Sequence, residues 1–317
     1  MKRHTPSGYV YALVSAMLLS TTGIFIQTLT MKGWEALPLA VWRAFIAGTV
    51  LVALSGWVST ETWRISWKQW GRLLQTGFAL ALFNGLWTYS VVINGAGRAT
   101  ILVYSSTGFA LLLDWLWEKI DCSLMKLLAA VLVFIGCLFA MDGRELGFHS
   151  WGGLALGMVS GLAYALYSRQ VRQATLNGLS VWQITGWSFV FSGMGLLIVW
   201  VCVGGSVPLC PEVGGSSWGL LCLLALGPTL AGFACYSQGL KFLPAGTVNT
   251  LAATEPFFTV MMECWLFALP FSFQILMSAV FVMGGVVFLH QSENRNTQGP
   301  AWKKSSPPRR RRGRSQF

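Results

Sequence analysis

Ten long stretches of apolar residues dominate this chain and limit the folds open to it. A bilayer core about 30 Å thick is crossed by a helix of about 20 mostly apolar residues. Lipid offers no hydrogen bonds to the backbone, so such stretches cross it as helices. The stretches are residues 8–29, 36–58, 71–93, 99–117, 124–141, 151–167, 181–203, 218–238, 246–267 and 273–290. We therefore predict an all-α integral membrane protein with ten transmembrane helices.

The composition excludes a soluble protein. The chain is 54% hydrophobic and only 10% charged, whereas a soluble domain carries about 25% charged residues. So few charges cannot cover a water-facing surface, and so much apolar sequence is not typical of disorder. The connections between the apolar stretches are mostly short, so no soluble catalytic domain is expected and we predict that the protein is not an enzyme.

The basic residues predict the orientation of the chain. With ten spans, 18 of the 22 Lys and Arg residues fall on one side of the membrane and 3 on the other, and Arg43 lies within a span. Basic residues concentrate on the cytoplasmic side. We therefore predict a multi-pass protein of the cytoplasmic (inner) membrane with both termini in the cytoplasm. Residues 291–317 are predicted to form a disordered basic tail that meets anionic lipid headgroups rather than nucleic acid.

Motifs for nucleotide or metal chemistry are absent from the sequence. It contains no GxxxxGK[ST] phosphate loop, no HExxH motif and no cluster of Cys and His residues. The seven cysteines form no CxxC pair, and we interpret most of them as small apolar filling. No cofactor, no metal and no catalytic residue is predicted, and any driving force is expected from a proton or solute gradient.

An internal repeat divides the chain. Residues 106–109 align with 254–257 at an offset of 148, and Gly136 aligns with Gly284 at the same offset. Each half then contains five spans, and an odd number requires the halves to insert with opposite orientations. This predicts two inverted five-helix repeats, residues 1–145 and 146–290, as in secondary transporters with a site at the repeat interface.

The chain resembles the EamA-like branch of the drug/metabolite transporter superfamily in its span number and in short motifs. The motifs are Arg43-Ala44-Phe45, Glu118-Lys119 followed by Gly136, and Thr254-Glu255-Pro256-Phe257-Phe258. The resemblance implies a secondary transporter of a metabolite or amino-acid-like solute, commonly in the export direction.

Two charged residues inside spans are the first candidates for a site, because a charge at the bilayer centre costs at least about 2.5–3.5 kcal/mol. Glu255 precedes Pro256, which frees the backbone carbonyl of Ala252. It is our first choice of proton carrier, and the alternative is a hydrogen bond that only holds the helix. Arg43 is interpreted either as a partner for an anionic solute or as a structural lock.

Further polar and aromatic residues are predicted to line the binding site, where aromatic rings suit organic solutes and, through their faces, cations. For each the alternative is packing or contact with lipid. These residues are Asn84, Tyr164, Trp187, Gln27, Tyr89, Tyr236, Asn249 and Asp114.

Two other functions stay open at this point. An enzyme acting on lipids would need clustered His, Asp or Ser residues near an interface, which the sequence lacks. A membrane scaffold or sensor would depend on the basic tail to recruit a partner, and the polar residues inside its spans would be dispensable.

Overall fold

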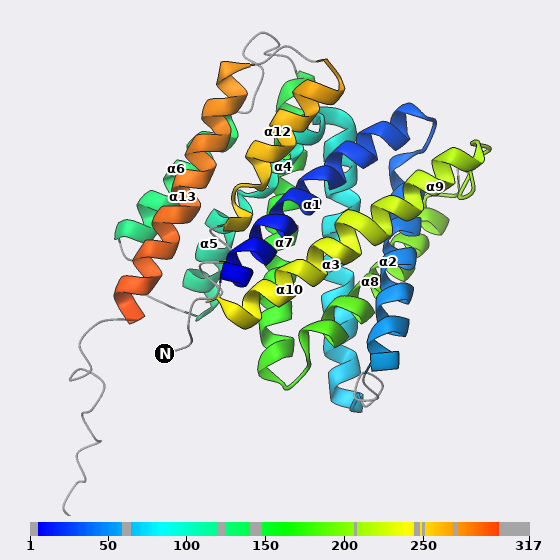
Figure 1. Ribbon diagram of the computed structural model, residues 1–317, viewed down its shortest axis with the longest axis horizontal. Helices are drawn as coiled ribbons and strands as arrows, with labels where there is room; N and C mark the ends of the chain where they lie inside the picture. The colour runs from blue at the N-terminus through cyan, green and yellow to red at the C-terminus, as the bar shows by residue number, and fades with distance from the viewer. Residues whose placement is uncertain are drawn as a thin grey trace, which may run out of the picture.

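The computed structural model describes residues 6–58, 65–118, 124–139, 148–205, 208–243, 248, 251–268 and 272–297. Every regular element within those ranges is a helix (Figure 1). The helices are α1 (Pro6–Met31), α2 (Ala36–Val58), α3 (Trp67–Asn94), α4 (Ala96–Val103), α5 (Ser106–Glu118), α6 (Leu124–Phe139), α7 (Phe148–Leu176), α8 (Val181–Cys202), α9 (Gly215–Leu224), η2 (Ala225–Ala231), α10 (Gly232–Phe242), α12 (Glu255–Leu266) and α13 (Phe273–Thr297). The all-α prediction is confirmed for these residues.

Each of the ten predicted spans contains a helix, but in the part of the chain that the structure describes, length and hydropathy alone identify seven helices that could cross a membrane. These seven are Ser7–Met31, Ala36–Gly56, Trp67–Asn94, Ala96–Trp117, Val181–Cys202, Gly215–Tyr236 and Phe273–Gln291. The other three predicted spans correspond to α6, α7 and α12. Of these, α6 is apolar but shorter, and α12 has only 12 residues.

Three predicted spans are interrupted. A turn at Tyr104 and Ser105 separates α4 from α5, and a turn at Ala253 and Thr254 separates helical residues 251–252 from α12 in the ninth span. In the eighth span a π-helical segment surrounds Pro228. Proline has no backbone N–H and leaves the carbonyl four residues earlier without its usual partner. The hydroxyl of Thr229 donates to that carbonyl, of Leu224, at 3.0 Å, so the backbone stays paired inside the bundle.

The helices pack in pairs that join distant parts of the chain (Figure 1). The α6–α13 pair stands at one edge of the molecule and the α2–α8 pair near the other. Between them α1 runs beside α10, and α3 lies against both α7 and α8. The residues that could form a site are therefore contributed by helices far apart in sequence.

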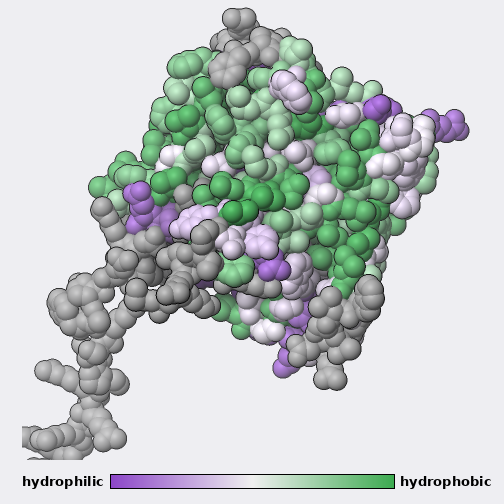
Figure 2. Space-filling model, viewed as in Figure 1, coloured by the Kyte–Doolittle hydropathy of each residue, from purple (hydrophilic) through white to green (hydrophobic). Residues whose placement is uncertain are grey.

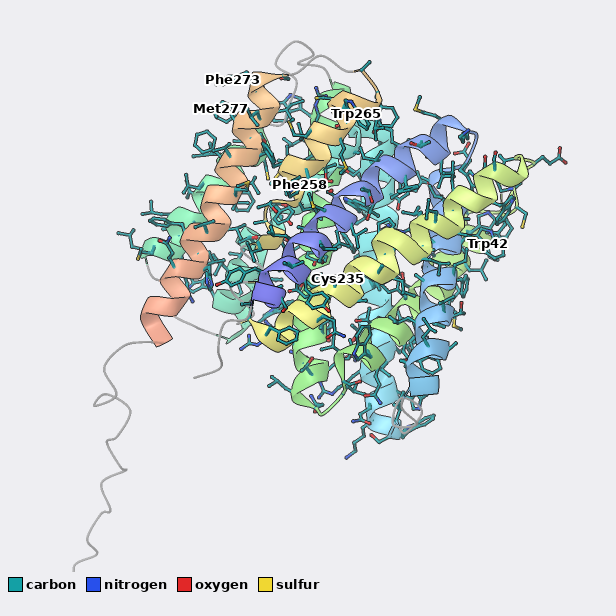
Figure 3. The ribbon with its side chains drawn as sticks, in the orientation of Figure 1. Trp42, Cys235, Phe258, Trp265, Phe273 and Met277 are labelled. Carbon is teal, nitrogen blue, oxygen red and sulfur yellow. The ribbon has the colours of Figure 1, made fainter. Side chains whose placement is uncertain are left out.

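Apolar side chains cover much of the outer surface. Figure 2 shows hydrophobic residues across the middle of the visible face and hydrophilic residues mainly toward its margins. Large apolar residues such as Leu82, Val199, Trp265 and Phe273 are exposed, and Figure 3 places Trp265 and Phe273 at the same end of the molecule. Such a surface is unfavourable in water and suits lipid tails.

Gly48 allows the close approach of α2 and α8 and offers a test of this packing. A Cβ atom there would lie 2.6 Å from the backbone nitrogen of Val190 and 2.9 Å from the carbonyl carbon of Phe189. Small residues permit such contacts between helices in lipid. We expect Gly48→Ala to destabilise the protein by about 1–3 kcal/mol, because it forces the two backbones apart.

Gly71 in α3 is the matched control, because a Cβ atom there would meet nothing within 4 Å. Gly71→Ala should stabilise its helix by roughly 0.5–1 kcal/mol. The measurement is thermal unfolding of both purified variants beside the wild type. Equal melting temperatures for the two variants would contradict the close contact between α2 and α8.

Candidate functional site

A buried arginine joins three helices. Arg43 follows Trp42, which is labelled in Figure 3, and its side chain is 3% exposed. Its Nη2 donates to Oδ1 of Asn84 in α3 at 2.7 Å, and Nδ2 of Asn84 donates to Oγ of Ser192 in α8 at 3.1 Å. Because Asn84 and Ser192 are also buried, this polar chain holds the guanidinium in a fixed position between α2, α3 and α8.

The charge of Arg43 has no carboxylate beside it among the residues that the structure describes. The guanidinium carbon lies 5.3 Å from the ring centre of Trp87, and Nε has no hydrogen-bond partner. A cation over an aromatic face gains about 0.5–2 kcal/mol. That gain is small compared with the cost of burying an unpaired charge. Because arginine stays protonated in proteins, the site has a net positive charge that these contacts do not neutralise.

Aromatic rings continue from Trp87 across the interior. Phe83, one turn away on α3, has its ring centre 6.1 Å from that of Trp87. Tyr164 of α7 lies 4.8 Å from Phe83, and Tyr167 lies 6.1 Å from Tyr164. We call these four residues the aromatic series: Trp87 and Phe83 on α3, and Tyr164 and Tyr167 on α7.

A second polar group lies at the start of α12, directly after the turn at Ala253 and Thr254. Glu255 is the first residue of α12, one turn before Phe258, which is labelled in Figure 3. The hydroxyl of Tyr104 lies 3.0 Å from Oε2 of Glu255 and 2.8 Å from the carbonyl oxygen of Ala252. The carbonyl that Pro256 deprives of a helical partner is therefore paired with a side chain from the break between α4 and α5.

Further tyrosines lie near this carboxyl group. Tyr164 of α7 is close to both Glu255 and Tyr236 of α10, and Tyr236 is also close to Tyr104. All four side chains are only partly buried. Because Tyr164 also belongs to the aromatic series, the series connects the Arg43 group with the Glu255 group.

A third polar group centres on Glu263, which was not among the predicted site residues. Glu263, further along α12, is 8% exposed and accepts backbone hydrogen bonds from Ala96 at 2.9 Å and Gly97 at 2.8 Å. Oε1 of Gln27 in α1 also accepts from the Ala96 amide, at 3.2 Å. The first amides of a helix lack partners within it and attract negative charge, so Glu263 caps α4 from another helix.

The sequence carries a signal for this cap. Gly95 lies between α3 and α4 with φ +81°, and Gly97 is in the first turn of α4; a Cβ atom at either glycine would strike the Glu263 carboxylate. A glycine pair at a break between two apolar helices, combined with a glutamate inside another span, indicates a backbone amide–carboxylate contact. The pairing itself requires the tertiary structure.

The structure brings most of the predicted site residues into these groups. Arg43 and Asn84 form one group, Glu255, Tyr164 and Tyr236 form another, and Gln27 joins Glu263. The remaining four predicted residues lie apart from these groups or outside the description.

Two of those four residues have other surroundings. Trp187 packs edge-on against Trp70, with ring centres 4.7 Å apart, and is next to Phe191. Tyr89 is 43% exposed on the outer side of α3. Asp114 lies in α5, but its side chain is outside the described part of the structure, and Asn249 lies outside the described residues.

An apolar helical exterior around a buried cation, a carboxyl group and aromatic rings defines a multi-pass membrane protein with a polar interior. The chain belongs to the EamA-like transporter family, whose sequence profile matches residues 6–141 and again residues 151–290. This confirms the family resemblance predicted from the motifs and places the protein among membrane transporters of small solutes.

Two relatives agree with this family. An uncharacterized transporter of Archaeoglobus fulgidus is 24% identical over 286 residues, which cover 88% of this chain and 95% of the relative. The uncharacterized transporter YwfM of Bacillus subtilis is 23% identical over 248 residues, covering 78% and 81%. A solved crystal structure matches 91% of this chain and 99% of its own chain with a TM-score of 0.65. Its sequence identity is 14%, so the likeness concerns the fold.

Proposed function

We propose that this protein is a proton-coupled secondary transporter. In this proposal it exports a small, amino-acid-like organic solute across the cytoplasmic membrane by alternating access. The contact of Tyr104 with both Glu255 and the Ala252 carbonyl carries the proposal. It joins an ionisable group to broken helices inside an apolar bundle, which is the arrangement that transporters use for solute and ion sites.

The packing supports two inverted halves of five helices each, with residues 1–145 and 146–290 as the halves. If the halves are exchanged, α1 corresponds to α7, and α3 to the α9–η2–α10 segment. The contact of α1 with α10 then corresponds to the contact of α7 with α3. In addition, α2 packs against its counterpart α8, and α6 against its counterpart α13. The two separate matches to the family profile also support this division.

The position of Glu255 supports a role at the interface of the halves. Tyr104 and Ala252, which are hydrogen-bonded, lie 148 residues apart in sequence, and this equals the offset of the repeat. Residues that contact their own counterparts lie close to a twofold axis. Glu255 is therefore near the axis, where inverted-repeat transporters bind their solutes.

Hydrogen bonding supports a proton on Glu255 in this conformation. The Tyr104 hydroxyl has a single hydrogen but lies within bonding distance of two acceptors. Both contacts are satisfied when a protonated Glu255 donates to the Tyr104 oxygen and Tyr104 donates to Ala252. When the proton leaves, the carboxylate and the carbonyl compete for one hydrogen. Loss of the proton is thereby linked to the helix break that precedes α12.

The charge distribution supports the orientation. In the ten-span topology both termini and the basic tail, residues 291–317, lie in the cytoplasm, where anionic lipid headgroups attract Lys and Arg. The end of the bundle formed by the α1–α2 connection and the α3–α4 break then faces outward. Glu263 and Gln27 would hold that outer end together.

Solute flux into proteoliposomes tests the proposal. Full-length protein is reconstituted and given a panel of labelled amino acids, nucleoside derivatives and amines, with and without an imposed pH gradient. We expect the gradient to drive accumulation of at least one solute well above that in protein-free vesicles. Folded protein without flux of any solute would reject transport of these classes. Deleting residues 298–317, which follow α13, should leave the flux unchanged, whereas a scaffold or sensor would depend on that part of the basic tail.

A further inference from the structure

Arg43 is a buried charged residue to which the proposed proton coupling assigns no role. Glu255 takes part in the proposed proton step and Glu263 is satisfied by backbone amides. Arg43 has only a neutral amide and a ring face as partners among the described residues. Buried cations in proteins are normally paired with an anion, and a bound solute is one source of that anion.

The contacts of Arg43 leave part of its guanidinium available. A guanidinium has five N–H donors in a planar fork that matches a carboxylate. Among the described residues no acid contacts the guanidinium: Nη2 donates to Asn84, and Nε is buried without a hydrogen-bond partner. Asn84 is itself held by Ser192. The guanidinium is therefore oriented before any ligand binds, which lowers the entropic cost of binding.

The surroundings of Arg43 also define what the rest of a ligand would meet. Trp87 lies under the guanidinium, and Phe83 and Tyr164 continue the aromatic series away from it. These rings offer an apolar surface beside a single positive charge. One guanidinium neutralises one negative charge, which favours a carboxylate over a doubly charged phosphate.

We infer that Arg43 determines substrate specificity by binding the carboxylate of the transported solute, whose apolar or aromatic body lies along the aromatic series. This inference rests on the proposed function and adds to it the chemical group that is recognised. Asn84 and Ser192 are positioning residues, because they orient the guanidinium. The solute class is an organic monocarboxylate with an apolar body, amino acids with apolar side chains included.

Paired compounds that differ only in the carboxylate test this inference. The probes are leucine and leucinamide, phenylalanine and phenylalaninamide, and 3-phenylpropionate and 3-phenylpropionamide. Their binding to purified full-length protein is measured by ligand-induced thermal stabilisation. We expect at least one acid to bind about tenfold or more tightly than its amide, as for a charge-assisted hydrogen bond. Inorganic phosphate should not compete with it.

Two test variants, Arg43→Gln and Asn84→Asp, assign the selectivity to Arg43. Arg43→Gln should abolish the difference in affinity between acid and amide. The control, Arg72→Gln at the start of α3, should leave that difference unchanged. Asn84→Asp places a carboxylate beside the intact arginine at a site that already contacts it. It should remove acid binding without lowering the melting temperature of the ligand-free protein. This second variant keeps the test valid if Arg43→Gln does not fold.

The outcomes separate this inference from the proposed function. No difference between acid and amide for any pair in the wild type would overturn the inference, as would selectivity retained in Arg43→Gln or in a folded Asn84→Asp. Competition by phosphate would also overturn the inference, because it would show that Arg43 recognises a phosphate group and not a carboxylate. Gradient-driven flux without acid selectivity would reject the inference alone. Acid-selective binding without any flux would reject transport and leave the carboxylate site standing.

Discussion

Glu255→Gln should abolish transport driven by a pH gradient while solute exchange between the two sides of the membrane continues. Glutamine is neutral and nearly the same size, so it imitates the protonated carboxyl and can donate to the Tyr104 oxygen. The Tyr104 hydroxyl then stays on the Ala252 carbonyl. The helix break should still move with solute bound, but no proton can be released, and the gradient can no longer do work on the solute.

The measurement uses proteoliposomes with a pH-sensitive dye inside and labelled solute outside. Accumulation driven by the gradient should fall to the level of protein-free vesicles, and counterflow of labelled for unlabelled solute should persist. Glu212→Gln is the control, since Glu212 is an exposed carboxyl group outside the helices. Gradient-driven accumulation at the wild-type rate in Glu255→Gln would show that another group carries the proton.

Tyr104→Phe tests the link between that proton and the helix break. The variant removes the hydroxyl that contacts both Glu255 and Ala252 but keeps the ring. It leaves a carbonyl and a carboxyl group without their partner, each at a cost of about 1–3 kcal/mol when buried. We expect slower gradient-driven flux and a lower melting temperature. Wild-type flux in this variant would mean that Glu255 acts without Tyr104.

Glu263→Ala should destabilise the protein by about 2–5 kcal/mol, the second large effect that we expect. The carboxylate accepts the backbone amides of Ala96 and Gly97, and its removal leaves two buried donors with weakened or lost bonds. In this variant the Ala96 amide can still donate to Gln27, at 3.2 Å, but the Gly97 amide loses its carboxylate acceptor. Glu263→Gln should cost less, because an amide oxygen can still accept one bond.

Thermal unfolding of the purified variants measures this effect. Glu212→Ala removes an exposed carboxyl group and should change stability by no more than about 0.5 kcal/mol. Gly97→Ala approaches the same contact from the other side, because its new Cβ atom meets the Glu263 carboxylate, and it should also lower the melting temperature. An unchanged melting temperature in Glu263→Ala would show that the amides find other partners.

Helix content and the family followed from the sequence because they depend on properties summed over many residues. An apolar stretch of sufficient length forms a helix in lipid regardless of its neighbours. Short motifs such as Arg43-Ala44-Phe45 indicated the family, whose profile matches both halves. Among the described residues, hydropathy nevertheless identifies only seven helices long and apolar enough to cross. Of the other three, α6 and α12 are short.

The face of each helix could not be predicted from the sequence. In a soluble helix an apolar stripe marks the buried face. In α2 and α8 apolar residues occur all round, because lipid and protein interior are both apolar solvents. Asn84 and Tyr89 both lie on α3, and hydropathy does not separate them. The structure buries Asn84 at 2% exposure and leaves Tyr89 at 43%.

The sequence by itself therefore determined the helices, the family and the charged residues that deserve a role, since burying a charge in lipid is costly wherever it occurs. Only the tertiary structure decided which groups meet: Arg43 with Asn84, Tyr104 with Glu255, and Glu263 with the first amides of α4. These contacts join residues from 41 to 167 positions apart. Short-range patterns carry no information on such pairs, which depend on how helices from both halves pack.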